Sequence, residues 1–210
     1  MDWYAFDNEN VTVLELDILN KASCFKVCEG ADTVIHLAAD PSPSASYESV
    51  KRINMDGTYN MMSAAHEQGC RRFIFASSIH AVKGYPRDEQ VKTESPVRPF
   101  DLYGVSKAFG EALGSYYAYQ TDMEVIAVRI GGFRSLDNMK KEGKQPVDYQ
   151  RTSYISKRDL IQLIDRCVKA KLSRPFEIVH GVSDNAFKYL DLSDTRVKLQ
   201  YQPQDDGFDV

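Results

Sequence analysis

The sequence has no long apolar segment and no excess of charge of one sign. No uninterrupted apolar run approaches the ~20 residues that span a bilayer, and the first residues, Met-Asp-Trp-Tyr, lack the basic-then-apolar pattern of a signal peptide. Lys and Arg number 26 against 30 Asp and Glu, with a net charge of -4 and no basic stripe. These absences argue against a membrane or nucleic-acid partner, and they predict a cytoplasmic protein.

Cysteine is also scarce, at four residues in 210. Cys24 and Cys28 are four positions apart on an expected helix, but no second Cys or His pair has the spacing of a metal site. We therefore expect reduced thiols in a reducing compartment and no structural metal.

What the sequence does have is an alternation of strand-like and helix-like runs. This order predicts a single α/β domain, a Rossmann-like doubly wound parallel sheet with helices on both faces. Two polar stretches without clear period, 84–99 and 133–154, are expected to be functional loops. His36 and His180 lie inside apolar strands and are expected in the core. The expected strands are 11–17, 32–39, 71–78, 124–130 and 176–180, and the expected helices are 23–29, 47–68, 103–120 and 157–170.

Tyr103 and Lys107 form the most informative local pattern. Their spacing on a helix places a phenol and an ammonium on one face, one turn apart. A nearby cation stabilises the phenolate and lowers the pKa of the phenol, so that such a tyrosine can exchange protons with an alcohol near neutral pH. Ser77 and Ser78 end a predicted strand, at the edge of the sheet where α/β proteins bind ligands.

Six motifs occur in the order typical of one family. The sequence resembles the extended short-chain dehydrogenase/reductases, the NAD-dependent epimerase/dehydratase family, and within it the uronate dehydrogenases, which oxidise the anomeric carbon of a hexuronic acid to a lactone. Further local signs are Gly84-Tyr-Pro-Arg87 and Phe109-Gly-Glu111; Ile79 departs from the asparagine that those enzymes have there. The six motifs are Leu16-Asp17, His36-Leu-Ala-Ala39, Asn54-x-x-Gly57-Thr58-x-x-Met61, Ser77-Ser78, Tyr103-x-x-x-Lys107 and Arg129-Ile-Gly131.

The resemblance implies roles for the catalytic residues. Tyr103 would be the general base, Lys107 would lower its pKa and hold the nicotinamide ribose, and Ser78 would orient the substrate hydroxyl. Asn54 would brace the site, although a helix residue that bonds the neighbouring backbone is an equally good interpretation.

The resemblance also implies a cofactor, NAD with NADP not excluded, and a small sugar or sugar-acid substrate. Each substrate residue has a plainer interpretation: His80 as a loop histidine, Ser42 as a turn residue and Arg151 as a surface arginine. Ala38 and Ala39 are open to interpretation as strand packing. The implied cofactor contacts are Asp17 at the adenine, Leu37, Ala38, Ala39, Tyr103, Lys107 and Ile130, and the implied substrate contacts are Ser42, Ser78, His80 and Arg151.

One family feature is missing. Relatives begin with a strand and a Gly-x-x-Gly-x-x-Gly turn that binds the pyrophosphate, whereas Gly30, Gly57 and Gly69 are isolated here. We therefore expect a sheet that lacks its first βα units, in a fragment of an enzyme with about 40 to 50 further residues, the size of a βαβα unit.

Three functions stay open at this point. The first is an NAD(P)-dependent dehydrogenase that oxidises a uronate to an aldarolactone, with a short substrate-binding portion at about 132–210. The second is a nucleotide-sugar epimerase, dehydratase or carbonyl reductase. The third is an inactive fragment or cofactor-free binding protein. A homodimer through the helices at 47–68 and 103–120 would follow the family pattern.

Overall fold

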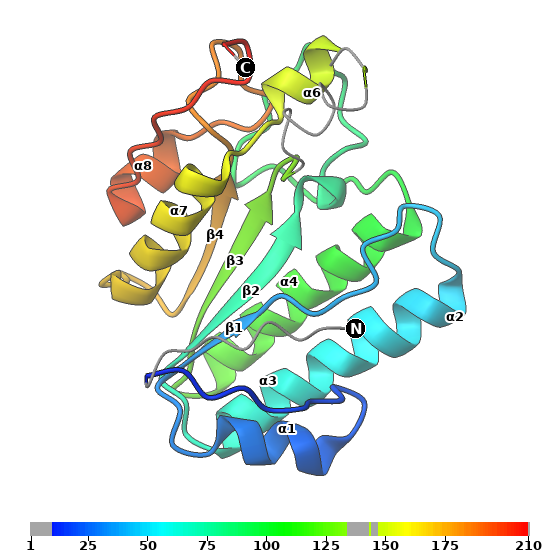
Figure 1. The fold of residues 1–210 in the computed structure, drawn as a ribbon, viewed down its shortest axis with the longest axis vertical. Helices are drawn as coiled ribbons and strands as arrows, with labels where there is room; N and C mark the ends of the chain where they lie inside the picture. Colours follow the sequence, from blue (N-terminus) through cyan, green and yellow to red (C-terminus); the bar gives the residue numbers. More distant parts are fainter. Residues whose placement is uncertain (1–9, 134–142, 144–146, 210) are drawn as a thin grey trace.

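The computed structural model describes residues 10–133, 143 and 147–209. In this part of the chain four parallel strands form one sheet, in the order β1-β2-β3-β4 (Figure 1). The predicted α/β class and parallel sheet are confirmed. The strands are β1 (Thr33–His36), β2 (Arg72–Ser78), β3 (Glu124–Ile130) and β4 (Phe176–Gly181).

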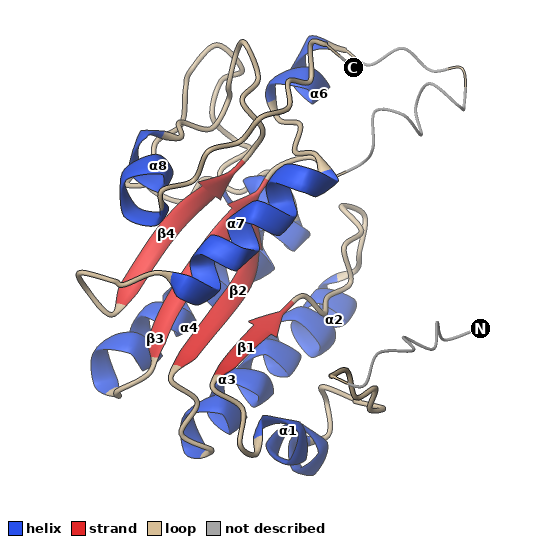
Figure 2. Ribbon diagram, turned by 60° about the vertical axis from the view of Figure 1, so that its left-hand side comes forward, coloured by secondary structure: helices blue, strands red, loops and turns tan. Residues whose placement is uncertain are grey.

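Helices cover both faces of the sheet (Figure 2). On one face pack α1, α3 and α4, and on the other α7, with α8 beside β4. The helical elements are α1 (Lys21–Cys28), α2 (Tyr47–Ser49), the π-helix η1 (Val50–Asp56), α3 (Gly57–Glu67), the 3₁₀ turn η2 (Ile79–Ala81), α4 (Leu102–Gln120), α6 (Asp148–Thr152), α7 (Lys157–Lys169) and α8 (Ser193–Leu199).

Strand β2 shows why the predicted strands are apolar throughout. Successive side chains point to opposite faces, so Phe73 and Phe75 join the core under α3 and α4, while Ile74 joins the core under α7. All three are at most 1% exposed. A strand buried on both faces has no polar alternation, as expected for a parallel sheet.

The expected strand at 11–17 is wrong. These residues form no strand, and Val13 and Leu14 are each 57% exposed. A strand needs a hydrogen-bonded neighbour, and the described residues place none beside this segment. β1 is likewise shorter than predicted, and Ile35 in the strand and Leu37 just after it are 41% and 64% exposed. Among the described residues, β1 forms one edge of the sheet and pairs only with β2.

The expected helix at 47–68 is present but interrupted. α2, η1 and α3 run on in one direction (Figure 1), with seven residues, Val50–Asp56, in the wider π-helical geometry. The other helices begin and end within two residues of their predicted limits. A short helix, α6, lies inside the predicted loop 133–154, part of which falls outside the described residues. His36 and His180 are 4% and 0% exposed, which confirms their core positions.

Candidate active site

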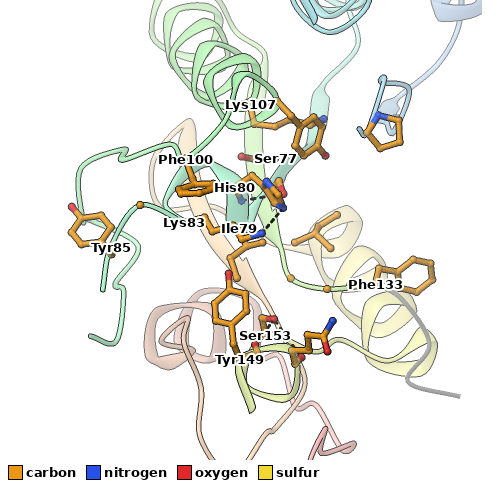
Figure 3. Close-up of a pocket in the computed structure, with 18 of the residues that line it drawn as sticks. Ser77, Ile79, His80, Lys83, Tyr85, Phe100, Lys107, Phe133, Tyr149 and Ser153 are labelled. Atoms are coloured by element: carbon orange, nitrogen blue, oxygen red, sulfur yellow. Dashed lines mark hydrogen bonds between the residues drawn. The ribbon is translucent and has the colours of Figure 1, made fainter. Parts of the chain in front are cut away.

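A cavity of about 1180 Å³ opens at the carboxyl ends of β1, β2 and β3 (Figure 3). Its lining comes from the residues that follow these strands, from the first turns of α4 and from α6. Ligand sites in proteins commonly measure 300–1,000 Å³. The cavity therefore has room for a sugar together with part of a dinucleotide. The position agrees with the rule that open α/β sheets bind ligands beyond the carboxyl ends of their strands.

Helix α4 places Tyr103 and Lys107 in this cavity. Asp101 caps the helix, its Oδ1 accepting from the backbone N–H of Gly104 at 2.7 Å. A glycine is required at 104, because a Cβ there would lie 2.2 Å from the His80 carbonyl oxygen. The first turn of α4 is thereby held against the end of β2.

The ammonium of Lys107 is buried, with the residue 4% exposed. Nζ donates to the Ala76 carbonyl at 2.8 Å and lies 5.3 Å from the ring centre of Tyr103. Burial lowers the pKa of this ammonium to about 8. The remaining N–H groups border the cavity, where they can donate to hydroxyl groups of a bound ligand.

The expected acidic tyrosine is not what the structure shows. Burial raises the pKa of Tyr103, and a hydrogen bond with Ser78 only partly opposes the rise. The physical reason is that Lys107 lies over the ring and directs an N–H to Ala76 rather than to the phenol oxygen. The spacing correctly predicted that Tyr103 and Lys107 lie close together. The lowered pKa that it predicted for the phenol differs from the raised pKa in this structure.

The two serines after β2 differ in their partners. Ser78 accepts a hydrogen bond from the His80 backbone at 3.2 Å and borders the cavity. Ser77 instead donates to the Glu111 carboxylate at 2.6 Å. Glu111 also pairs with the buried Arg129 through two N–H···O contacts of 2.9 Å. Ser78 is thus the serine available to a substrate, and Ser77 belongs to a buried network.

His80 forms a hydrogen-bonded chain at the cavity wall. Its Nδ1 lies 2.7 Å from an Asp101 carboxylate oxygen, and Lys83 Nζ lies 3.3 Å from its Nε2. A neutral imidazole fits both contacts, since Nδ1–H then donates to Asp101 and Nε2 accepts from Lys83. Burial lowers the pKa of His80, although Asp101 opposes this shift. The ring meets Tyr103 edge to face at 5.4 Å between centroids.

Asn54 ties two segments around the site together. Its Oδ1 accepts from the Asp40 backbone N–H at 2.7 Å, and its Nδ2 donates to the Asp40 carbonyl and to Ser106 Oγ. The side chain comes from the π-helical segment and is 3% exposed. It therefore fixes the loop after β1 against α4, one residue from Lys107.

The residues implied for the cofactor divide into two groups. Leu37, Ala39 and Ile130 line the cavity beside Tyr103 and Lys107, whereas Ala38 is outside the lining. Asp17 is exposed and also lies outside it, with Oδ1 accepting from the Leu19 backbone at 2.9 Å. The residues present thus fit the nicotinamide and ribose end of NAD, where a buried ammonium faces open space.

Two residues implied for the substrate lie elsewhere. Arg151 donates to the carbonyls of Gly207 and Phe208 at 3.1 and 3.4 Å, so its guanidinium is held by the C-terminal segment and not by the cavity. Ser42 is in a turn that begins at Asp40, where its hydroxyl meets Ser44 at 3.0 Å. Neither residue lines the cavity in this structure.

Among the residues of the cavity to which sequence reasoning assigned no role are Lys83, Arg87 and Tyr149. Lys83 and Arg87 follow the serine pair, and Tyr149 comes from α6. Figure 3 shows Tyr149 and Ser153 across the cavity from Lys107 and Ser77. A Lys and an Arg close behind Ser78 were a visible signal for the first two. No local pattern brings Tyr149 to them. In the described part of the chain, no group of three or more His, Cys, Asp or Glu side chains is arranged to hold a metal, and every helix is too short or too polar to cross a bilayer.

Comparisons with known proteins agree with this geometry. The NAD-dependent glucose-6-phosphate dehydrogenase of Haloferax volcanii is 36% identical over 98% of this chain and 85% of its own length. A uronate dehydrogenase of Pseudomonas putida is 32% identical over 92% of this chain and 68% of its own length. The crystal structure of uronate dehydrogenase from Agrobacterium tumefaciens matches with a TM-score of 0.82 and 29% identity, covering 93% of this chain and 70% of that one. The model of the NAD dependent epimerase/dehydratase family matches residues 3–133. The chain therefore belongs to the NAD dependent epimerase/dehydratase family and is an enzyme of that family.

Proposed function

We propose that the protein oxidises a hydroxyl group of a sugar acid, taking a uronate to its aldarolactone with NAD(P) as the hydride acceptor. The observation that carries the proposal is the meeting of Ser78, Tyr103 and Lys107 in one cavity, with the ammonium buried and bordering open space. The sugar dehydrogenases among the relatives support the same class of reaction.

Three residues have different roles in the proposed proton transfer. Ser78 donates to the substrate oxygen and orients it, and the phenolate of Tyr103 takes the hydroxyl proton. Lys107 stabilises the phenolate by charge and holds ribose hydroxyls through its free N–H groups. NAD, when bound beside Tyr103 and Lys107, would supply the acceptor for the hydride that leaves the same carbon. A carbonyl remains on the sugar, which for the anomeric carbon of a ring is a lactone.

The raised pKa of Tyr103 has a consequence for this mechanism. The phenol needs a positive charge near its oxygen to ionise at neutral pH, and Lys107 is the cation that the chain provides. Its Nζ lies 5.3 Å from the ring centre of Tyr103 while one N–H is bonded to the Ala76 carbonyl, so its positive charge is close to the phenol.

The test is the appearance of NADH absorbance with a panel of sugars. Glucuronate and galacturonate are the expected substrates, with glucose 6-phosphate, L-arabinose and nucleotide sugars as comparisons. Glucose 6-phosphate and L-arabinose are included because two relatives of this chain are named as dehydrogenases of these sugars. Reduction of NAD with a uronate supports the proposal, and no reduction with any uronate contradicts it.

A further inference from the structure

We propose that Lys83, Arg87 and Tyr149 form the binding site for an anionic group of the substrate, a carboxylate or a phosphate on the sugar. We call these three residues the basic wall, and Ser78, Tyr103 and Lys107 the catalytic wall. The inference rests on the proposed function, because it assigns the far end of the same substrate. Arg151, the cation implied as a substrate contact by the resemblance, lies outside the cavity, and Lys83 and Arg87 take its place in this proposal.

The two cations converge on one aromatic ring. Lys83 Nζ lies 5.7 Å and Arg87 Cζ lies 5.0 Å from the ring centre of Tyr149. All three residues line the cavity, and Figure 3 shows Lys83 between His80 and Tyr149, on the side of the cavity away from Lys107. A sugar that presents a hydroxyl to Tyr103 therefore extends its other end toward two positive charges.

The described residues place no carboxylate in an ion pair with either of these charges, on Lys83 or on Arg87, and the hydrogen bond seen for Lys83 goes to neutral His80. Asp101 is the acidic group that acts on Lys83 through space, and its carboxylate is already engaged by His80 and the N-terminus of α4. The two cations repel one another, since Arg87 contributes to the lowered pKa of Lys83, so an anion that contacts both is favourable.

The hydroxyl of Tyr149 gives an independent indication of a ligand. Its oxygen is buried and has no hydrogen-bond partner. A buried polar group without a partner is costly, and it is uncommon in native proteins unless a water or a ligand satisfies it. An anion oxygen that enters the cavity beside this ring can accept the O–H.

The segment that carries the cations is held in place. The Gly84 N–H donates to the Arg98 carbonyl at 2.8 Å, and a Cβ at Gly84 would lie 2.6 Å from that oxygen. The Tyr189 hydroxyl donates to the carbonyls of Val82 and Tyr85 at 3.0 and 3.2 Å, and its ring packs on Tyr149. The basic wall is thus fixed before a ligand arrives, which lowers the entropy lost on binding.

The experiment compares the binding of charged and neutral sugars by calorimetry, without NAD. The probes are glucuronate, glucose 6-phosphate and glucose, and the variants are Lys83→Gln, Arg87→Gln and Tyr149→Phe. The matched control is Arg98→Gln, because Arg98 stacks on Tyr85 at 5.3 Å and does not line the cavity. Arg87 and Arg98 are both exposed, so neither substitution disturbs the core.

We expect Lys83→Gln and Arg87→Gln each to weaken the binding of an anionic sugar about tenfold, and Tyr149→Phe to weaken it less. The affinity for glucose should be the same in all variants. Arg98→Gln should bind every sugar as the wild type does. Whichever of glucuronate and glucose 6-phosphate depends on the wall identifies the anion as carboxylate or phosphate. Equal affinity for charged and neutral sugars, or equal losses for both in the variants, would overturn the inference. Wall-dependent binding with no NADH formation would instead contradict the proposed oxidation alone.

Discussion

The two walls of the cavity are built by different means. The catalytic wall comes from the end of β2 and the first turns of α4, and its Lys107 is 4% exposed. The basic wall comes from the segment after η2 and from α6, and its Arg87 is exposed. Burial in the first wall raises the pKa of Tyr103 and lowers that of Lys107, so the proposed proton transfer depends on the charge that Lys107 places beside the phenol. In the second wall the guanidinium of Arg87 is open to solvent, where an incoming anion can reach it.

Removal of the phenol should give the largest effect and break the catalytic wall alone. We expect Tyr103→Phe to lower the rate of NADH formation about a thousandfold, because the general base is lost. Unfolding by denaturant should be unchanged. Tyr116→Phe, a 60% exposed tyrosine of the same helix, is the control and should retain full activity. Substantial activity in Tyr103→Phe would remove this residue from the mechanism.

Acid should weaken the structure behind both walls. Burial lowers the pKa of His36 on β1 and of His180 on β4 to about 4. The unfolded chain binds these protons near pH 6.5, so the free energy of unfolding should fall as the pH drops from about 6.5 to about 4. Each histidine accounts for up to about 3 kcal/mol, at 1.4 kcal/mol per pH unit.

His180→Asn separates the two contributions. The Nδ1 of His180 is 2.8 Å from the Asp191 carbonyl, a contact that an asparagine amide can replace, while Nε2 is buried without a partner. The fall in the free energy of unfolding between about pH 6.5 and 4, measured by urea denaturation, should be smaller in this variant by the contribution of His180. An unchanged dependence would mean that His180 is not held neutral.

Lys107→Met should show that the buried charge of Lys107 lowers the free energy of unfolding of the protein. The pKa shift from 10.5 to about 8 corresponds to about 3 kcal/mol of unfavourable burial of the charge. The lost hydrogen bond to Ala76 offsets part of it. We expect a variant about 2 kcal/mol more stable at pH 7 and at least a hundredfold less active.

The pH dependence of stability gives a second readout for the same variant. The wild-type lysine has a depressed pKa, so its penalty is fully present below about pH 8 and disappears as the pH rises toward 10.5. The wild-type free energy of unfolding should therefore rise across this window, and that of Lys107→Met should not. A less stable Lys107→Met would contradict the account of a strained lysine.

Gly110→Ala should produce the smallest loss and move the catalytic wall as a unit. A Cβ at 110 would lie 2.2 Å from Phe75 Cζ, so α4 must shift away from β2. We expect about 1–3 kcal/mol of destabilisation, with activity reduced equally for charged and neutral sugars. Ser115→Ala on the same helix is the control. A selective loss for anionic sugars would mean that the two walls are not independent.

The catalytic wall could be predicted from the sequence and the basic wall could not, for a physical reason. Tyr103 and Lys107 are related by helical spacing, and Ser78 by the end of a strand, so local periodicity places all three. Tyr149 reaches Lys83 and Arg87 only through packing of α6 against Tyr189, which no period in the sequence records. The error at 11–17 has the same origin, since an apolar run becomes a strand only beside a neighbour.

The most direct test of the division between the walls is the ratio of kcat/KM for glucuronate to kcat/KM for glucose. We predict that Tyr103→Phe lowers both values and leaves the ratio unchanged, whereas Lys83→Gln combined with Arg87→Gln lowers the ratio and leaves the glucose value unchanged. Two results would contradict the account: a lower ratio in Tyr103→Phe, or a ratio equal to that of the wild type in the double variant of Lys83 and Arg87.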